Sequence, residues 1–232
     1  MMLGARTGAW AKSGGGVPTA KDYVQNGLVA MWDGIENARW GVHDASATEW
    51  KSLIGGPNFK NCSFSSDTCS VTSDSSPAFE GWPFSHVTVE LVVARLAGTT
   101  QNHSATVSQY MRINGSASAF GFVAQRSPDN TKQYVSMMKL RQVEASDNPE
   151  SRQYLAATYN YANGLETCNY YHNGVKIYTT TSQREIDFYS QTIYLSIRKN
   201  NLFNRISISS RALTAEEIAH NYAIDKARFN LP

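Results

Sequence analysis

The chain has 232 residues, with 21 Lys and Arg against 19 Asp and Glu, so its formal net charge is +2. Charged residues make up only 17% and hydrophobic residues 41%, which is enough apolar sequence to build a core and excludes wholesale disorder. Without a Lys/Arg cluster there is no electrostatic case for nucleic-acid binding. No apolar run approaches the ~20 residues that a membrane helix requires. We therefore expect a soluble, β-rich binding or structural domain.

The first twenty residues differ in composition from the rest. They are rich in Gly, Ala and Ser and contain Gly14-Gly15-Gly16, which is typical of a flexible arm that orders on a partner. We expect such an arm over residues 1–20 and a single domain over residues 21–232. The start lacks the charged and apolar regions of a signal peptide, so if it is native we expect export by another route, for instance inside a virus particle.

Most of the remaining chain consists of short apolar or alternating runs separated by Gly, Pro, Asn and Ser. These runs predict strands at residues 28–32, 87–96, 110–113, 120–125, 134–143, 154–159, 166–171, 175–180, 193–198 and 203–209. The Asn173-Gly174 pair between two of them predicts a tight hairpin, because both turn residues tolerate positive φ. Many short strands at regular spacing indicate a large antiparallel sandwich.

One helix is specified near the C-terminus. Thr214 with Glu217 three residues later forms a capping-box pattern, which predicts a helix over residues 215–226. An apolar stripe at helical spacing follows the cap and is expected to pack on the sandwich, with Tyr222 in the core. The stripe consists of Ile218, Ala219 and Tyr222.

The chain has three cysteines, Cys62, Cys69 and Cys168, and an odd number excludes full intrachain pairing. Cys62 and Cys69 are close enough in the sequence to bridge a hairpin, and free thiols are the other alternative. Because no histidine clusters beside them, we do not expect a zinc site.

Four segments resemble the concanavalin A-like, laminin G-like sandwich superfamily. They are Gly-Leu-Val-Ala-Met-Trp-Asp at 27–33, Trp-Lys-Ser-Leu-Ile-Gly-Gly at 50–56, Tyr-Tyr-His-Asn-Gly-Val-Lys at 170–176 and Arg-Ala-Leu-Thr-Ala-Glu-Glu-Ile at 211–218. In the second segment Ser52 stands where the family often has Asp. The resemblance covers residues 23–227, and residues 32–44 are similar to versions found in gut bacteria and their phages.

This resemblance implies an all-β fold, a two-sheet antiparallel concanavalin A-like jelly-roll sandwich with one short C-terminal helix. Members of the superfamily often bind glycans and sometimes calcium, but the fold implies no single activity.

The same superfamily contains glycoside hydrolases, whose signature places three carboxylates on one face of a strand. Glu185 and Asp187 match its first two positions, but the third is Tyr189, or Ser190 if a bulge intervenes, and a tyrosine is a poor proton donor. The sequence contains no other catalytic motif. We expect a protein without catalytic residues, with glycoside hydrolase as a distant alternative.

Glycan recognition requires flat apolar rings together with directional hydrogen-bonding groups. The residues of this kind in two expected loops are Asn37, Trp40 and His43 in the first, and Tyr161 and Asn163 in the second. Trp40 packing its loop against the sandwich is the alternative interpretation. Oxygen ligands for calcium would come from Asp33, Glu36 and Asp44, although their spacing matches no EF-hand.

The functional hypothesis is a non-catalytic recognition module for cell-surface or mucin-type glycans, displayed on a phage particle or a bacterial surface. The alternative is a structural virion protein that uses the sandwich for assembly and threads its N-terminal arm into neighbouring virion proteins, with a homo-oligomer as a further expectation. We expect no cofactor other than the calcium considered above, no nucleic acid and no membrane insertion.

Overall fold

The structure is a computed structural model of the chain. It describes residues 16–73, 78–82, 86–95, 108–114, 121–126, 133–137, 141–146, 151–183, 191–196 and 201–232. The first fifteen residues of the expected N-terminal arm and the Glu185–Tyr189 segment lie outside the described residues. At the end of the expected arm, Ala20 is fully buried and its backbone N–H donates to Oε1 of Glu36 at 2.9 Å. Ala20 therefore packs as part of the folded domain.

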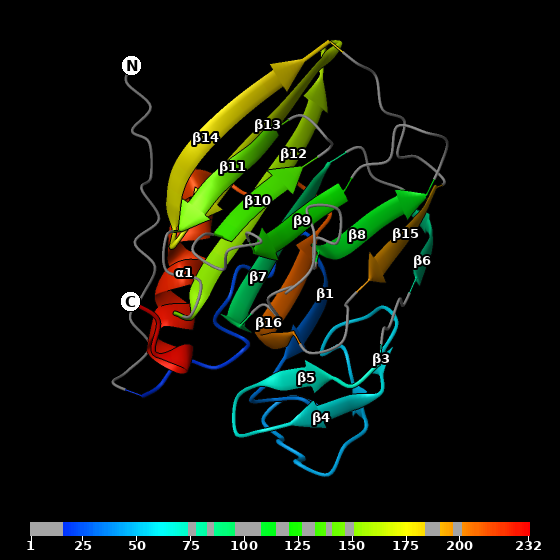
Figure 1. The fold of residues 1–232 in the computed structure, drawn as a ribbon, viewed down its shortest axis with the longest axis vertical. Coiled ribbons are helices and arrows are strands. Elements are labelled where there is room, and N and C mark those ends of the chain that lie inside the picture. The colour runs from blue at the N-terminus through cyan, green and yellow to red at the C-terminus, as the bar shows by residue number, and fades with distance from the viewer. Residues whose placement is uncertain are drawn as a thin grey trace, which may run out of the picture.

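Eight strands form the larger sheet (Figure 1). They are β1 (Leu28–Asp33), β4 (Cys62–Phe64), β5 (Cys69–Val71), β7 (Val87–Arg95), β12 (Gln153–Ala162), β13 (Leu165–His172), β14 (Val175–Ser182) and β16 (Leu202–Ser209). Their order is β14-β13-β12-β7-β16-β5-β4, and β1 also pairs with β16. Every pairing in this sheet is antiparallel.

The second sheet has six strands in the order β11-β10-β9-β8-β15-β6 and is also antiparallel throughout. They are β6 (Ala78–Trp82), β8 (Ser108–Asn114), β9 (Gly121–Arg126), β10 (Gln133–Met137), β11 (Arg141–Ser146) and β15 (Gln191–Ser196). A separate two-stranded ladder joins β2 (Glu49–Trp50) to β3 (Phe59–Lys60).

The two sheets form the layers of a sandwich, so the all-β fold with one C-terminal helix is confirmed. Figure 1 shows the second sheet in front of the larger one, and β11 contacts both β13 and β14. Strand β7 shows how the layers are built, since its side chains alternate between two faces. Val87, Val89, Leu91 and Val93 enter the main core, whereas Glu90 and Val92 face the other way.

Helix α1 (Ala215–Phe229) covers the opposite face of the larger sheet (Figure 1). The predicted capping box is confirmed, with Thr214 Oγ1 accepting from the Glu217 N–H at 3.3 Å and Glu217 accepting from the Thr214 N–H at 2.9 Å. The predicted stripe is wrong in part, because Ala219 is exposed. The buried face instead carries three polar residues, and it consists of Ile218, Asn221, Ile224, Asp225, Arg228 and Phe229.

The predicted strands correspond to observed ones, with two kinds of error. The run at 134–143 is two strands, β10 and β11, separated after Met137. The short strands β2 to β5 and β6 were not predicted. The hairpin at Asn173-Gly174 is confirmed, with φ of 46° and 75° at its two turn residues.

Candidate functional site

Two of the three predicted calcium ligands, Asp33 and Glu36, are partners of an arginine. Asp33 is buried and its carboxylate accepts from Arg228, with Nη1 2.5 Å from Oδ2 and Nη2 3.2 Å from Oδ1. Oε1 of Glu36 accepts from the same guanidinium at 3.0 Å. Burial raises the pKa of Asp33, while the Arg228 charge opposes that shift. A guanidinium occupies the position between these carboxylates that a cation would need.

The third predicted calcium ligand, Asp44, is used by its own turn. Its Oδ1 accepts from the Ser46 N–H at 2.9 Å and from the Ser46 hydroxyl at 2.6 Å, and these bonds lower the pKa of Asp44. Within the ranges that the structure describes, no group of three or more His, Cys, Asp and Glu side chains is arranged to hold a metal ion. In this structure the three predicted calcium ligands therefore do not converge on a common position.

Asn37 is a structural residue of the same loop. It is fully buried, its Nδ2 donates to the Asp44 carbonyl at 2.8 Å, and its Oδ1 accepts from the Asp44 N–H at 2.7 Å. Both ends of the amide thus close the loop over Asp44. The side chain is fully buried, so no part of it is exposed to a ligand in this structure.

Trp40 and His43 remain at the surface of this loop. Trp40 is partly buried and packs against a small core cluster that includes Tyr23 and Leu53, and the ammonium of Lys21 lies 5.8 Å from its ring centroid. This arrangement agrees with the alternative interpretation of Trp40 given above, in which its ring packs the loop against the sandwich. His43 is exposed, and its Nδ1 lies 3.1 Å from the carbonyl oxygens of Gly34 and Ile35.

Tyr161 and Asn163 belong to a hairpin rather than to a loop. Strand β12 runs on to Ala162, and β13 begins at Leu165, so only Asn163 and Gly164 form the turn, with φ of 54° and 75°. Asn163 is exposed at the turn, whereas Tyr161 is a strand residue whose ring is partly buried against the main core.

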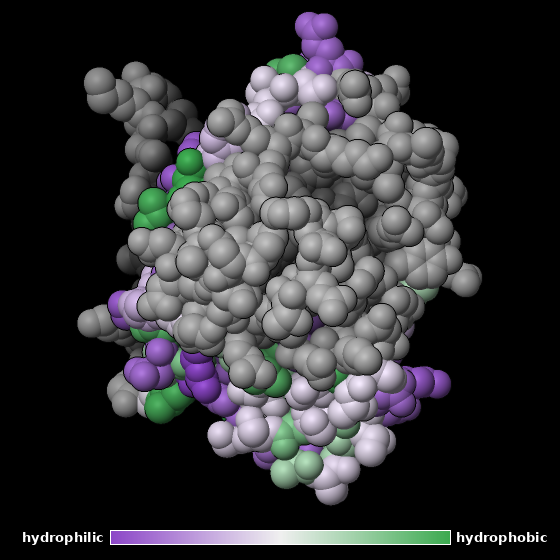
Figure 2. Space-filling model, viewed as in Figure 1, coloured by the Kyte–Doolittle hydropathy of each residue, from purple (hydrophilic) through white to green (hydrophobic). Residues whose placement is uncertain are grey.

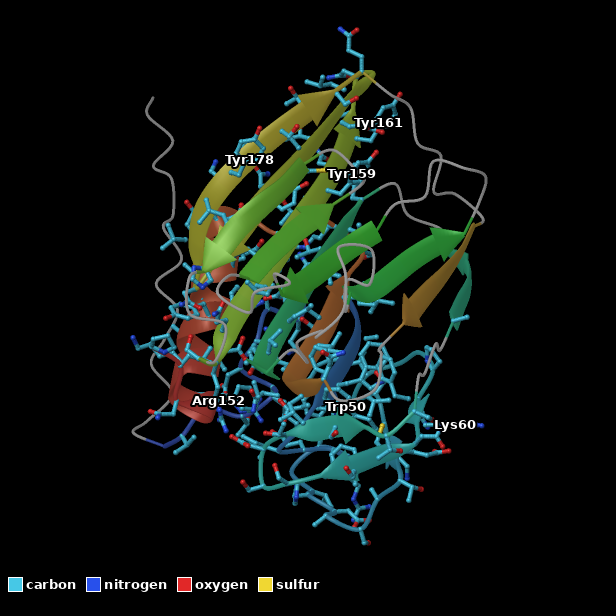
Figure 3. All side chains as sticks on the ribbon, in the orientation of Figure 1. Trp50, Lys60, Arg152, Tyr159, Tyr161 and Tyr178 are labelled. Atoms are coloured by element: carbon cyan, nitrogen blue, oxygen red, sulfur yellow. The ribbon has the colours of Figure 1, made fainter. Side chains whose placement is uncertain are left out.

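Tyr161 shares one sheet face with other tyrosines. Period-2 alternation brings residues from three neighbouring strands to the core side of the larger sheet. We call them the tyrosine face, and they are Tyr159 and Tyr161 from β12, Glu166 and Tyr170 from β13, and Tyr178 from β14. Figure 3 shows Tyr161 and Tyr159 near one end of β12 and Tyr178 on the outer strand.

The tyrosine face has a buried centre and partly exposed margins. Tyr159 and Tyr170 are fully buried, while Tyr161 and Tyr178 keep part of their rings exposed. The Tyr170 and Tyr178 rings lie 6.1 Å apart between centroids at 43°. Tyr161 pairs with Glu166 and Tyr178 with Tyr170, so the two exposed rings are about 13 Å apart along the strand direction.

A carboxylate lies among these rings. The Tyr159 hydroxyl donates to Oε1 of Glu166 at 3.3 Å, and Glu166 is buried. Burial raises the pKa of Tyr159, with the Glu166 charge adding to the shift, so this hydroxyl stays protonated and able to donate. The buried Tyr159–Glu166 bond thus fixes the centre of the tyrosine face, and the partly exposed rings of Tyr161 and Tyr178 are the part of it that a sugar could stack on.

Sequence reasoning found Tyr161 and missed Glu166, Tyr170 and Tyr178. The period-2 alternation along the strands could have identified them, because residues two apart on a strand share a face. The Asn173-Gly174 turn also fixes the register of β13 against β14.

The other missed feature is a buried polar cluster under α1. Oε1 of Glu90 accepts from the Tyr154 hydroxyl at 2.6 Å and from Nδ2 of Asn221 at 3.0 Å. Arg205 donates to Asp225 through Nε at 2.9 Å and Nη2 at 2.7 Å. All these side chains are essentially inaccessible, so the cluster attaches the helix to the sheet and offers no open site.

The described surface shows no large apolar patch. Its exposed large hydrophobic side chains occur singly, and they are Val17, Ile54, Leu165 and Val175. Figure 2 shows the coloured part of one face as mostly hydrophilic to neutral, with separate green areas. No helix in the described part of the chain is both long and apolar enough to cross a membrane.

No protein-family model matches the chain, and no curated protein matches it. Solved structures do. Trypanosoma rangeli sialidase with 2,3-difluorosialic acid as a covalent intermediate matches with a TM-score of 0.60 and 11% identity, covering 94% of this chain and 35% of that chain. A mutant of the same sialidase that displays trans-sialidase activity gives a TM-score of 0.59 and 11% identity, covering 92% and 34%.

The chain thus spans about a third of the length of the sialidases it matches. At this identity the similarity shows the fold alone, a β-sandwich. A weaker match, with a TM-score of 0.48 and 15% identity, is domain 4 of the arabinanase AbnA from Geobacillus stearothermophilus in complex with arabinotriose, covering 84% of this chain and 98% of that domain.

Proposed function

We propose that the protein is a non-catalytic glycan-recognition module of the concanavalin A-like superfamily and that its binding surface is the tyrosine face. The observation that carries the proposal is the pair of partly exposed rings, Tyr161 and Tyr178, on either side of the Tyr159–Glu166 hydrogen bond. These two rings would stack on the C–H faces of sugars and their hydroxyls would bond to sugar hydroxyls, while the buried Glu166 holds the Tyr159 ring in place beneath them.

The charge of this surface favours neutral sugars or amino sugars. Among the described side chains of the tyrosine face, Glu166 is the charged one. A buried carboxylate repels an acidic sugar and attracts a sugar ammonium group. One of the similar sialidase structures holds sialic acid. At its low identity the similarity shows the fold alone, so it does not indicate that this chain binds sialic acid.

The spacing of the two exposed rings favours an oligosaccharide over a single sugar. A separation of about 13 Å along the strands is longer than one sugar ring, so both rings can contact the same ligand only when it has several units. A mucin-type or cell-surface glycan chain meets this requirement. We further propose display on a phage particle or bacterial surface, supported by the resemblance of residues 32–44 to versions from such sources.

The test compares the tyrosine face with the other predicted loop. Tyr161→Ala and Tyr178→Ala are each expected to reduce binding to a glycan array or to immobilised mucin about tenfold or more, since each removes one stacking ring. Trp40→Ala tests the first loop, and Val175→Ala, an exposed position on β14, is the matched control. Loss of binding in Trp40→Ala with none in the two tyrosine variants would place the site on the first loop instead.

A structural role in assembly is the second candidate, and β14 favours it. This strand ends the order of the larger sheet, and no described strand pairs with its outer side. Unpaired edges are surfaces on which other strands can add. Concentration-dependent oligomers, measured by light scattering, together with no binding on a broad glycan array, would support assembly over recognition.

A further inference from the structure

The hairpin of β4 and β5 carries two of the three cysteines on the same side. Cys62 pairs with Val71 and Cys69 with Phe64, so the cysteines are diagonal neighbours across the ladder. Cys62, Cys69, Phe64 and Val71 all pack in or against the main core, which places their side chains on one face. Both are free, buried thiols in the structure, and Sγ of Cys62 donates to the Lys60 carbonyl at 3.6 Å.

The third cysteine is separate from this pair. Cys168 lies on β13, and β12, β7 and β16 stand between it and β5 in the sheet order. Four strand spacings amount to about 19 Å, which is beyond the reach of a disulfide. Cys168 is also a free, buried thiol, so it serves as an internal control.

The environments of Cys62 and Cys69 give them different chemical roles. Interaction with the neighbouring Cys69 thiol lowers the pKa of Cys62, while burial raises the pKa of Cys69. A thiolate attacks disulfides, whereas a buried thiol of raised pKa does not attack first. Cys62 is therefore the thiol expected to attack a small disulfide, and Cys69 the thiol expected to resolve the resulting mixed disulfide.

We propose that Cys62 and Cys69 form a redox-active pair that closes into a disulfide across the β4–β5 hairpin when the protein meets a low-molecular-weight disulfide. The Cys62 sulfur attacks one sulfur of the oxidant, which forms a mixed disulfide and releases one thiol. The Cys69 thiol then loses its proton and attacks the Cys62 sulfur, which releases the second thiol. Two protein thiols are oxidised and one small disulfide is reduced to two thiols, so atoms and electrons balance.

The position of the hairpin in the fold determines how an oxidant reaches the two thiols and how the Cys62–Cys69 disulfide affects stability. Both thiols are buried, so a reagent reaches them only when the hairpin opens locally; β4 and β5 are short and lie at one end of the sheet order, where such opening is most accessible. The hairpin packs on Trp50, whose ring lies 6.4 Å from that of Phe64. Its turn residue Asp67 pairs with Arg152 at 2.5 Å; Trp50 and Arg152 are labelled in Figure 3. Closing the short loop raises the Tm by roughly 5 °C.

The experiment exposes the folded full-length protein to glutathione disulfide, blocks the remaining thiols by alkylation, and measures intact mass and a peptide map. We expect the wild type to lose two of its three alkylatable thiols and to give a peptide linking Cys62 to Cys69. Cys168→Ala should form the same link. Cys69→Ala, which lacks the resolving thiol, should accumulate a glutathione adduct at Cys62, and Cys62→Ala should form neither link nor adduct at Cys69.

The proposal is overturned if the folded wild type keeps three alkylatable thiols under conditions that fully oxidise a small dithiol. A link that involves Cys168, or one between two chains, overturns it as well. Circular dichroism establishes which variants fold. If a variant does not fold, the peptide map of the wild type still shows whether Cys62 and Cys69 are linked. The result is independent of glycan binding, so either proposal can fail alone.

Discussion

Arg205 and Asp225, 20 residues apart in the sequence, form a doubly bonded ion pair in which neither side chain is exposed. Strand β16 supplies the arginine, and α1 supplies the aspartate. The pair is completed by the Tyr23 hydroxyl, which donates to Oδ1 of Asp225 at 2.6 Å, and by the Tyr23 ring, whose centroid lies 4.4 Å from Cζ of Arg205. Helix and sheet are thus joined through buried charges as well as apolar contacts.

Removing one member of this pair should be strongly destabilising. Asp225→Ala leaves the Arg205 guanidinium buried with less compensation, and we expect the free energy of unfolding to fall by about 3–5 kcal/mol. Urea denaturation measures the loss. Lys226→Ala, an exposed change on the same helix, is the control and should stay within about 0.5 kcal/mol.

The double change Arg205→Met with Asp225→Leu tests whether the loss of stability comes from an unpaired buried charge or from lost packing. Since it removes both charges together, it should recover part of the loss seen in Asp225→Ala. A double variant that is less stable than the single one would show that Arg205 acts mainly through Glu90, from which its Nη2 lies 3.4 Å.

The same aspartate should give stability an unusual pH dependence. Burial raises the pKa of Asp225 from 3.8 to about 6, against the opposing effect of Arg205. Between these values the folded state binds the proton more strongly than the unfolded state. The contribution of Asp225 to stability is therefore fully present below about pH 4 and falls by about 3 kcal/mol as the pH rises through about 6.

Urea titrations at several pH values between about 4 and 7 check this dependence, with Asp225→Asn as the reference. Other carboxylates, such as Glu217 beside Arg211, have lowered pKa values and shift stability in the opposite direction. The difference between wild type and variant isolates Asp225. Parallel curves for the two proteins would contradict the prediction.

The sequence predicted those parts of the fold that depend on local chemistry. The capping box at Thr214 and the turn at Asn173-Gly174 involve residues close in the sequence, and both were identified correctly. Strand β7 was recognised from its apolar run, within one residue at its C-terminal end. Such features need no knowledge of the tertiary structure.

The candidate site was harder to predict because its residues meet only through strand pairing. Asp33 and Glu36 have the composition of a cation site, but their actual partner, Arg228, is 195 residues away from Asp33. Likewise, Tyr178 joins Tyr161 on one face only when β12, β13 and β14 are placed in register. Residue type indicated the chemistry of each side chain, while the long-range contacts determine which side chains meet.

Calcium should have no stabilising effect on this fold. Because Arg228 holds the carboxylates of Asp33 and Glu36, removal of divalent ions with a chelator is expected to leave the Tm unchanged, as is addition of millimolar calcium. Thermal melts followed by circular dichroism measure both. A rise in Tm with calcium that is lost in Asp44→Asn would restore the metal site at this loop.

Two glycines of the same φ allow the contact between helix and hairpin to be tested. Gly164 and Gly174 both have φ of 75°, so alanine at either position carries the same backbone strain of about 1 kcal/mol. A Cβ at Gly164 meets nothing within 4 Å, whereas one at Gly174 would lie 2.6 Å from Cδ1 of Tyr222. Gly174→Ala should therefore cost about 1–3 kcal/mol more than Gly164→Ala in urea denaturation, since the Tyr222 ring must move. Adding Tyr222→Ala removes the ring and should narrow the difference between the two glycine changes, leaving only the Cβ of residue 222 at 3.0 Å from the added Cβ. An unchanged difference would mean that the Tyr222 ring is not its source.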